Sequence, residues 1–143
     1  MILLDTNVVS EPLKAPGDLN VLAWIDDQLL ETLYLSTISL AELRFGIAAL
    51  PEGKRRDTLQ TSLESRVLPL FADRILPFDE RASKAYAVLR ARARASGKAI
   101  APADGYIAAI AAAHGFAVAT WDTSPFEAAD LTVINPWTWR PQT

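Results

Sequence analysis

The sequence predicts an α/β domain with three layers, in which a mostly parallel β-sheet lies between helices. Short apolar runs of strand length alternate along the chain with longer stretches whose apolar residues recur at helical spacing. The first run, Ile2 to Leu4, is apolar without interruption, which is typical of a strand buried on both faces of a parallel sheet. With 143 residues and 50% hydrophobic composition, the chain has the size of one ordinary domain. We therefore expect a single domain over residues 1–143, with 135–143 as a C-terminal tail.

The expected elements follow this alternation in order. Strands are expected at 2–4, 32–36, 75–76, 117–120 and 132–134. After the first strand, Thr6 or Asn7 can cap a short helix, since either side-chain oxygen accepts a bond from a free backbone N–H. Later helices are expected to be capped by Asp18, Ser39, Asp79 and Ser124, and two more are expected to begin at Lys54 and Pro102. Gly97 is expected to end the helix after Asp79, and Gly115 the helix that begins at Pro102. In the helix after Asp18 the apolar stripe is expected to consist of Val21, Leu22, Ile25 and Leu29.

The composition limits the chemistry and the compartment. The chain has no cysteine, which excludes disulfide bonds and thiolate metal ligands and leaves oxygen ligands and one histidine, His114. His114 is expected at the C-terminal end of a helix or on the surface. Met1 leads directly into a strand, without the basic region and apolar segment of a signal peptide and without a spanning helix. We therefore expect a soluble protein of the reducing cytoplasm with no membrane partner.

Four acidic residues are expected at positions where they can converge. Asp5 and Asp122 follow the ends of strands, which is where open α/β sheets bind ligands, and Glu42 and Asp104 lie near the starts of helices. Simpler explanations exist for each. Asp5 can be a turn or cap residue, and Asp104 can complement a helix macrodipole. Glu42 follows Ser39 by three residues, the spacing of a capping box.

Convergence of the four acids would indicate a metal site. Like charges gathered in one cleft raise one another's pKa and cost stability unless a cation lies between them. Carboxylates without histidine or cysteine favour a hard ion, Mg²⁺ or Mn²⁺, which keeps positions open for phosphate oxygens. Such a site is suited to phosphodiester hydrolysis, because the metal activates the attacking water and no histidine base is required.

Several short motifs resemble those of PIN-domain ribonucleases in order and spacing. They are Leu-Leu-Asp-Thr-Asn at 3–7, Ser-Leu-Ala-Glu-Leu at 39–43, Ala-Asp-Gly-Tyr-Ile-Ala-Ala at 103–109 and Ala-Thr-Trp-Asp-Thr-Ser-Pro-Phe at 119–126. Within the family the chain is most similar to VapC-type toxins of toxin–antitoxin pairs, and among them to the FitB type, which it also resembles at 68–72 and 135–137. The resemblance implies a five-stranded parallel sheet. It also implies metal binding by Asp5, Glu42, Asp104 and Asp122, supported by the hydroxyl of Thr120.

The same resemblance implies an activity and partners. The chain would be a Mg²⁺- or Mn²⁺-dependent endoribonuclease and the toxin of a pair, with RNA as its substrate. It would form a homodimer and bind a cognate antitoxin that inserts a segment near the acids, and it would reach DNA only through that antitoxin. The alternative is a catalytically weak PIN domain that mainly binds an antitoxin and, through it, operator DNA.

Two further features bear on RNA binding. The family often has a basic or amide residue before the last acid, where this chain has Trp121, so a phosphate contact is lost or Trp121 stacks on a splayed base, an interaction worth roughly 1–3 kcal/mol. The net charge is −3, yet residues 81–98 hold six basic residues and no acid. Arg90 and Arg94 lie on one helix face and Arg92 lies off it. This stretch is either a solvated face or a contact for RNA.

Overall fold

The computed structural model describes residues 1–141 and contains a five-stranded sheet whose strand pairs are all parallel. Its strands are β1 (Ile2–Leu4), β2 (Leu33–Ser36), β3 (Ile75–Leu76), β4 (Ala117–Ala119) and β5 (Val133–Ile134). They lie in the order β3-β2-β1-β4-β5, so β1 is central, and Leu4 is in register with Leu35 and Ala119. The predicted parallel α/β fold is confirmed, as are its strands to within a residue or two.

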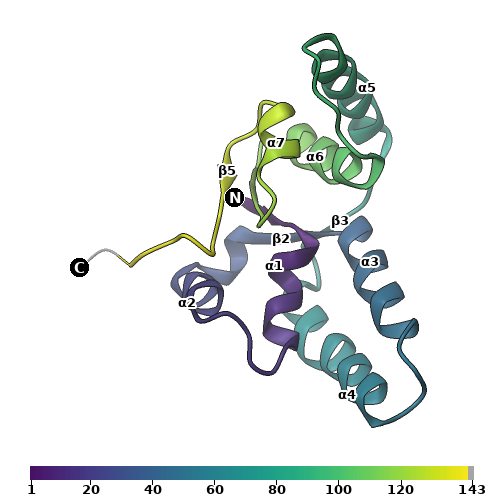
Figure 1. Ribbon diagram of the computed structural model, residues 1–143, viewed down its shortest axis with the longest axis vertical. Helices are drawn as coiled ribbons and strands as arrows, with labels where there is room; N and C mark the ends of the chain where they lie inside the picture. The colour runs from purple at the N-terminus through teal and green to yellow at the C-terminus, as the bar shows by residue number, and fades with distance from the viewer. Residues whose placement is uncertain (142–143) are drawn as a thin grey trace.

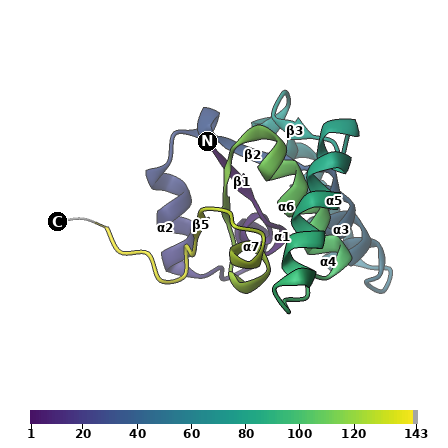
Figure 2. The same cartoon turned by 90° about the horizontal axis from the view of Figure 1, so that it is seen from above.

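Helices cover both faces of the sheet. Within residues 1–141 they are α1 (Thr6–Ser10), α2 (Leu19–Asp27), α3 (Thr37–Ala48), α4 (Lys54–Ser62), α5 (Glu80–Ala95), α6 (Pro102–His114) and α7 (Ser124–Ala128). Figure 1 shows α5, α6 and α7 on one side of the strands, α1, α2 and α4 on the other, and α3 beside β3 at one edge. Viewed from above, α6 lies between α7 and α5 (Figure 2). The predicted three layers are therefore present.

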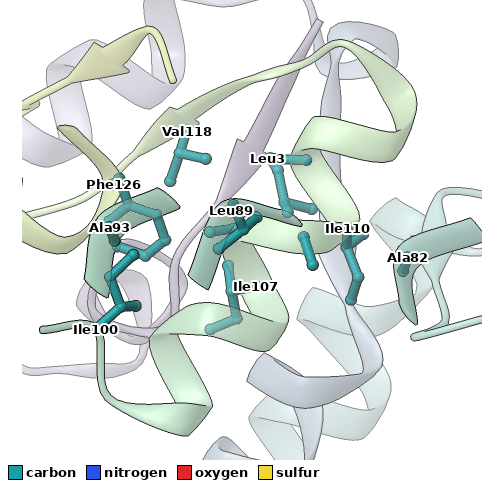
Figure 3. Packing of buried hydrophobic residues seen from close by; sticks show 12 residues of the cluster. Leu3, Ala82, Leu89, Ala93, Ile100, Ile107, Ile110, Val118 and Phe126 are labelled. Atoms are coloured by element: carbon teal, nitrogen blue, oxygen red, sulfur yellow. The ribbon is translucent and has the colours of Figure 1, made fainter. Parts of the chain in front are cut away.

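The core divides into two clusters because successive strand residues face opposite sides of the sheet. Leu3 points toward α5 and α6, where it packs with Leu89, Ile107 and Phe126 (Figure 3). Leu4 points the other way and belongs to the cluster that contains residues of α1 and α2. β1 joins these two clusters because it is apolar on both faces, as the sequence predicts.

The strand order reverses beside β1. The chain goes from β1 to β2 and β3 on one side, and then adds β4 and β5 on the other side. The order therefore reverses between β1 and β4, and ligands of open α/β sheets bind beyond the carboxyl ends of the strands at such a point. Asp5 follows β1 there and Thr120 follows β4.

Several predicted helix starts need correction. Asp5 itself caps α1 by accepting a hydrogen bond from Thr6 N at 2.8 Å, so neither Thr6 nor Asn7 is the cap. Ser36, and not Ser39, caps α3 by accepting from Ser39 N at 3.0 Å. The predicted capping box is therefore wrong.

Smaller departures occur elsewhere in the chain. α7 is preceded by Thr123, so Ser124 is its first residue and not its cap. Leu29 lies beyond the end of α2 and is 66% exposed, whereas the predicted stripe placed it inside. Asp18, Asp79 and Gly115 occupy the predicted caps, and α5 ends at Ala95, just before Gly97.

After α4 the chain does not continue as regular α-helix. The α-helix ends at Ser62 and continues as a π-helical turn, Leu63–Val67, and a 3₁₀ turn, Leu68–Phe71. Pro69 lies in the first turn of the latter and has no N–H for an α-helical bond, so regular helix cannot continue through it. No helix in the described part of the chain is long and apolar enough to span a membrane. Of the predicted tail, 142–143 lie outside the described residues.

Candidate functional site

The centre of the candidate site is Asp5, at the carboxyl end of the central strand. The side chain is only 5% exposed and accepts hydrogen bonds from Thr6 N and, at 2.8 Å, from the hydroxyl of Thr120. Burial raises the pKa of Asp5, the two hydrogen bonds partly offset this rise, and the charges of Asp104 and Glu42 add to it. Asp5 is therefore both a helix cap and a buried acid that faces other acids.

Thr120 connects the ends of the two adjacent strands. Its fully buried hydroxyl donates to Asp5 Oδ2 and accepts a bond from Asp122 N at 3.2 Å. One hydroxyl thus fixes the orientation of the Asp5 carboxylate and the start of the loop that carries Asp122. This placement fits the supporting role that the family resemblance implies for Thr120.

Asn7 makes a second link between these loops that sequence reasoning missed. Asn7 Nδ2 lies 3.4 Å from Asp5 Oδ2, while Asn7 Oδ1 accepts from Trp121 N at 3.2 Å. The sequence predicts Asn7 only as a possible helix cap, although it is the last residue of the Leu-Leu-Asp-Thr-Asn motif. That motif was the signal that could have identified it.

Glu42 reaches the site from α3. Its Oε1 accepts from the hydroxyl of Thr6 at 2.8 Å, and Thr6 Oγ1 also lies 2.9 Å from Ser39 Oγ. Glu42 therefore does not bond back to a helix cap, and its carboxylate is exposed on the side of α3 that faces α1. Thr6 and Ser39, which the sequence marked only as caps, hold α1 and α3 together at this point.

Asp104 lies in the first turn of α6 and is half-buried. Its pKa is raised, first by burial and then by the charges of Asp122 and Glu42. Gly105, the next residue, lets α5 pack closely, since a Cβ there would lie 3.0 Å from Tyr86 Cε2. The helix dipole of α6 therefore stabilises the charge of Asp104, whereas the neighbouring acids destabilise it.

Asp122 and Trp121 lie at the exposed side of the site. Asp122 is exposed and is anchored through its backbone N–H to Thr120. Trp121 is 59% exposed, and its ring meets that of Trp137 edge to face with centroids 5.3 Å apart. The indole is therefore accessible beside the acids, which leaves stacking on an RNA base as a prediction.

The four acids, which we call the acidic cluster, offer only oxygen donors, the ligand type that a hard divalent cation prefers. Asp5 and Asp104 each experience the charge of two others, and within residues 1–141 none of the four takes part in an ion pair with a basic side chain. No three acidic or histidine side chains of that range already surround one point at metal-binding distance. Binding an ion by three of them therefore requires side-chain movement, and Glu42 and Asp122 are the two that are exposed.

His114 lies outside this cluster. It is the last residue of α6, whereas Asp104 is in the first turn, and ten residues of helix separate two positions by about 15 Å. Its ring is near Phe116, with centroids 5.3 Å apart. The predicted place of His114 at a helix C-terminus is confirmed.

The chain is similar to known proteins in both sequence and fold. The family model for the PIN domain matches residues 2–131. The chain is 66% identical to VapC ribonuclease Y4jK of Sinorhizobium fredii, over 96% of this chain and 98% of that protein. It is 56% identical to Toxin FitB of Neisseria gonorrhoeae, over 96% of this chain and 99% of that protein. The structure of FitAB bound to an IR36 DNA fragment contains a chain that superposes with a TM-score of 0.94 at 52% identity, with 100% of both chains covered.

Proposed function

Because this chain belongs to the PIN domain family, we propose that it is a metal-dependent endoribonuclease and the toxin of a toxin–antitoxin pair. The observation that carries the proposal is the group of four carboxylates at the carboxyl edge of the sheet, none of them paired with a basic side chain within residues 1–141. Clustered acids that no protein cation neutralises are costly unless a ligand supplies the charge. RNA is the substrate that the relatives' activity suggests, and the cytoplasm is the compartment in which it would be met.

Asp5, Glu42, Asp104 and Asp122 are the residues that would hold Mg²⁺ or Mn²⁺. Their all-oxygen donor set suits these hard ions and would suit a soft ion poorly. When bound, the metal lowers the pKa of the attacking water and stabilises the negative charge that develops on the phosphate oxygens.

The chain's own residues keep the acids ready for this task. Thr120 holds Asp5 in one orientation, because its hydroxyl proton is committed to Asp5 Oδ2 at 2.8 Å. Asn7 ties the first turn of α1 to the loop after β4 by accepting from Trp121 N. Thr6 holds the Glu42 carboxylate at the start of α1 by donating to it at 2.8 Å. Together these contacts preorganise the buried half of the site and leave Glu42 and Asp122 at the solvent side.

The proposed partners are a cognate antitoxin and a second copy of the chain. The structure of FitAB bound to a DNA fragment, which contains a chain similar to this one, supports an antitoxin as partner. That the chain reaches DNA only through this antitoxin is part of the proposal. We expect the antitoxin to cover the acidic cluster and so block the access of RNA. A homodimer follows from the family resemblance and is tested by the mass of the purified protein in solution.

A second candidate function is a PIN domain that binds an antitoxin and operator DNA but cleaves RNA weakly. The observation that favours it is that no three acids within residues 1–141 are already arranged around one point. If the first candidate is right, the acidic side chains rotate toward the metal when it binds. If the second is right, the separated acids are the functional arrangement of the protein.

Cleavage assays separate these candidates. Protein stripped of metal is incubated with a mixed RNA pool, Mg²⁺ or Mn²⁺ is added, and the cut ends are mapped. We expect cleavage only with added metal, loss of cleavage in Asp104→Asn, and full cleavage in His114→Ala, because His114 lies far from the acids. Cleavage that survives chelation, or that is lost with His114, would contradict the mechanism.

Growth assays test the role of toxin. Expression of the chain alone should arrest growth, and coexpression with the small protein encoded beside its gene should relieve the arrest. Asp5→Asn should be harmless while still binding that partner. A wild-type protein that binds the partner but neither cleaves RNA nor arrests growth would favour the second candidate.

A further inference from the structure

A cavity of about 840 Å³ lies where α5 ends and the chain turns toward α6. We call it the basic cavity, because three of its lining residues, Arg90, Arg94 and Lys98, are cationic and none is acidic. The buried Ile100 and small alanines form the rest of its wall, together with Tyr86. Arg90 and Arg94 are four residues apart, so they lie on the same face of α5.

The cations of the basic cavity are not neutralised by acidic side chains. Arg90 donates to the neutral hydroxyl of Tyr86 at 2.7 Å and lies over the ring of Tyr86, 5.4 Å from its centroid. In residues 1–141 neither Arg94 nor Lys98 forms an ion pair, whereas Lys84, earlier on the same helix, pairs with Glu80. Unpaired cations gathered around a hollow favour a polyanion as ligand.

The basic cavity adjoins the acidic cluster at two points. Lys98 also lines a second cavity, which is bounded by Asp122 and the first turn of α7. On the other side, a Cβ on Gly105 would lie 3.5 Å from Arg90 Cδ, and Gly105 is the residue after Asp104. A strand bound along the acids can therefore continue over Lys98 to Arg94 and Arg90.

We infer that the basic cavity binds the phosphate backbone of the RNA strand on one side of the cut site, an inference that rests on the proposed function. Guanidinium groups suit this task because one planar guanidinium can donate two parallel hydrogen bonds to two oxygens of a phosphate. Bases are not the expected ligands, since the ring of Tyr86 stacks on Tyr106, with centroids 4.9 Å apart, and also carries Arg90. Binding here should therefore depend on charge and be insensitive to sequence.

The test compares two variants on α5 and its C-terminal loop. Arg94→Gln with Lys98→Gln removes two charges from the basic cavity. Lys84→Gln with Arg92→Gln removes two charges from the opposite side of the helix, where both residues line a different cavity together with Asp130. The four residues are exposed, and glutamine keeps part of each aliphatic stem, so both double variants should unfold near the wild-type temperature.

The readout is the affinity for a fluorescent single-stranded RNA in the presence of a chelator, measured as a function of salt. Each lost phosphate contact should lower the slope of log affinity against log salt by about 0.7 and weaken binding on the order of eightfold at 50 mM salt. We expect a slope lower by about 1.4 for Arg94→Gln with Lys98→Gln, with the same change for RNAs of different sequence. The control pair should change the slope much less.

Cleavage by the same proteins with added Mg²⁺ separates the failure of this inference from the failure of the proposed function. If the two double variants have equal salt slopes and wild type cleaves RNA, the basic cavity does not bind the RNA backbone. The nuclease proposal would stand in that case. A reduced slope for the cavity variant with no cleavage by wild type would support an RNA-binding cavity and reject the nuclease. Loss of antitoxin binding in the cavity variant with an unchanged RNA slope would assign the cavity to an acidic peptide and overturn the inference.

Discussion

At the scale of single residues, Asp5 has two roles with opposite energetics. As the cap of α1, its carboxylate satisfies Thr6 N, which stabilises the helix start. As a buried acid facing Asp104 and Glu42, the same carboxylate is destabilising, because burial and like charges both raise its pKa. Asparagine retains the first role and removes the second, so one substitution separates them.

We therefore predict that Asp5→Asn is at least as stable as wild type without metal. With Mg²⁺ the order should change, because the variant lacks one proposed ligand. For an assumed dissociation constant of about 1 mM, 10 mM Mg²⁺ would stabilise wild type by about 1.4 kcal/mol through mass action. In a domain of this size this is a rise of roughly 3–6 °C in Tm.

Thermal unfolding of both proteins at constant ionic strength measures this difference, since constant ionic strength keeps screening from being mistaken for binding. The variant should show much less of the Mg²⁺-dependent rise. Equal rises in the two proteins, together with retained cleavage by Asp5→Asn, would remove Asp5 from the metal site.

The positions of the acids could be predicted from the sequence, but their contacts could not. Asp5 and Asp122 were identified because strand ends are visible as breaks in apolar runs. The bond from Thr120 to Asp5 joins residues 115 positions apart, and local patterns carry no signal for such a pair. Glu42 was misread for the same reason, since its partner Thr6 lies 36 positions away while Ser39 stands at capping-box spacing.

At the scale of elements, the start of α3 determines where Glu42 points. The fully buried Ser36 ends β2 and caps α3 in the same step, so the helix begins at Thr37. Glu42 then lies in the second turn, on the side that faces α1. A helix started at Ser39 would place this carboxylate in the first turn, against the backbone of its own cap.

We predict that Ser36→Ala lowers the free energy of unfolding by about 1 kcal/mol, the usual cost of removing a helix N-cap. Thr37→Ala is the matched control, because Thr37 is the exposed neighbour in the first turn. Its loss should change stability by no more than about 0.5 kcal/mol. Urea denaturation of both variants gives the comparison, and a larger loss in Thr37→Ala than in Ser36→Ala would contradict the assigned cap.

Helices with strong local signals were predictable, and those shaped by tertiary context were less so. Asp79 and Gly115 mark their helix ends by chemistry that acts within a few residues. After α4 the apolar spacing of Leu59, Leu63 and Val67 still reads as helix, yet the chain there forms π and 3₁₀ turns ahead of Pro69. The apolar pattern predicts which residues face the core but not the type of helix that the backbone forms there.

At the scale of the whole molecule, the parallel class could be predicted but not the order of the strands. Alternation of strands and helices restricts the connections to parallel crossovers. It does not tell whether β4 joins the sheet beside β1 or beside β3. The position of the candidate site depends on that choice, because Thr120 follows β4 and Asp5 follows β1. Had β4 paired with β3, two strands would lie between Thr120 and Asp5.

Charge is also distributed at this scale. Six basic residues lie within 81–98, and five of them line cavities along α5 and the loop after it, while the four candidate ligands lie at the carboxyl edge of the sheet. Separation of this kind is what a nuclease for a polyanion requires, since the acids must remain free for metal while another surface attracts the substrate. The net charge of −3 conceals both regions.

The last prediction concerns the pH dependence of stability without and with metal. Burial is the main cause of the raised pKa of both Asp5 and Asp104. Between the unfolded value, about 3.9, and the raised folded values, the native protein holds more protons than the unfolded chain. Stability from these two groups therefore falls as pH rises through this window, so metal-free wild type should gain on acidification relative to Asp5→Asn with Asp104→Asn. The exposed Glu64, whose pKa is lowered by Arg44, has the opposite direction, but it is common to both proteins and cancels.

Saturating Mg²⁺ should reverse this relative trend. Protons compete with the ion for the same carboxylates, so binding favours their deprotonated form and the stabilisation that metal provides is lost as pH falls. Melting curves of wild type and the double variant, recorded from pH 4 to 7 with and without Mg²⁺ at constant ionic strength, measure both directions. The same pH dependence of Tm for the two proteins in both conditions would contradict the proposed mechanism. It would mean that Asp5 and Asp104 neither destabilise the metal-free protein nor bind the metal.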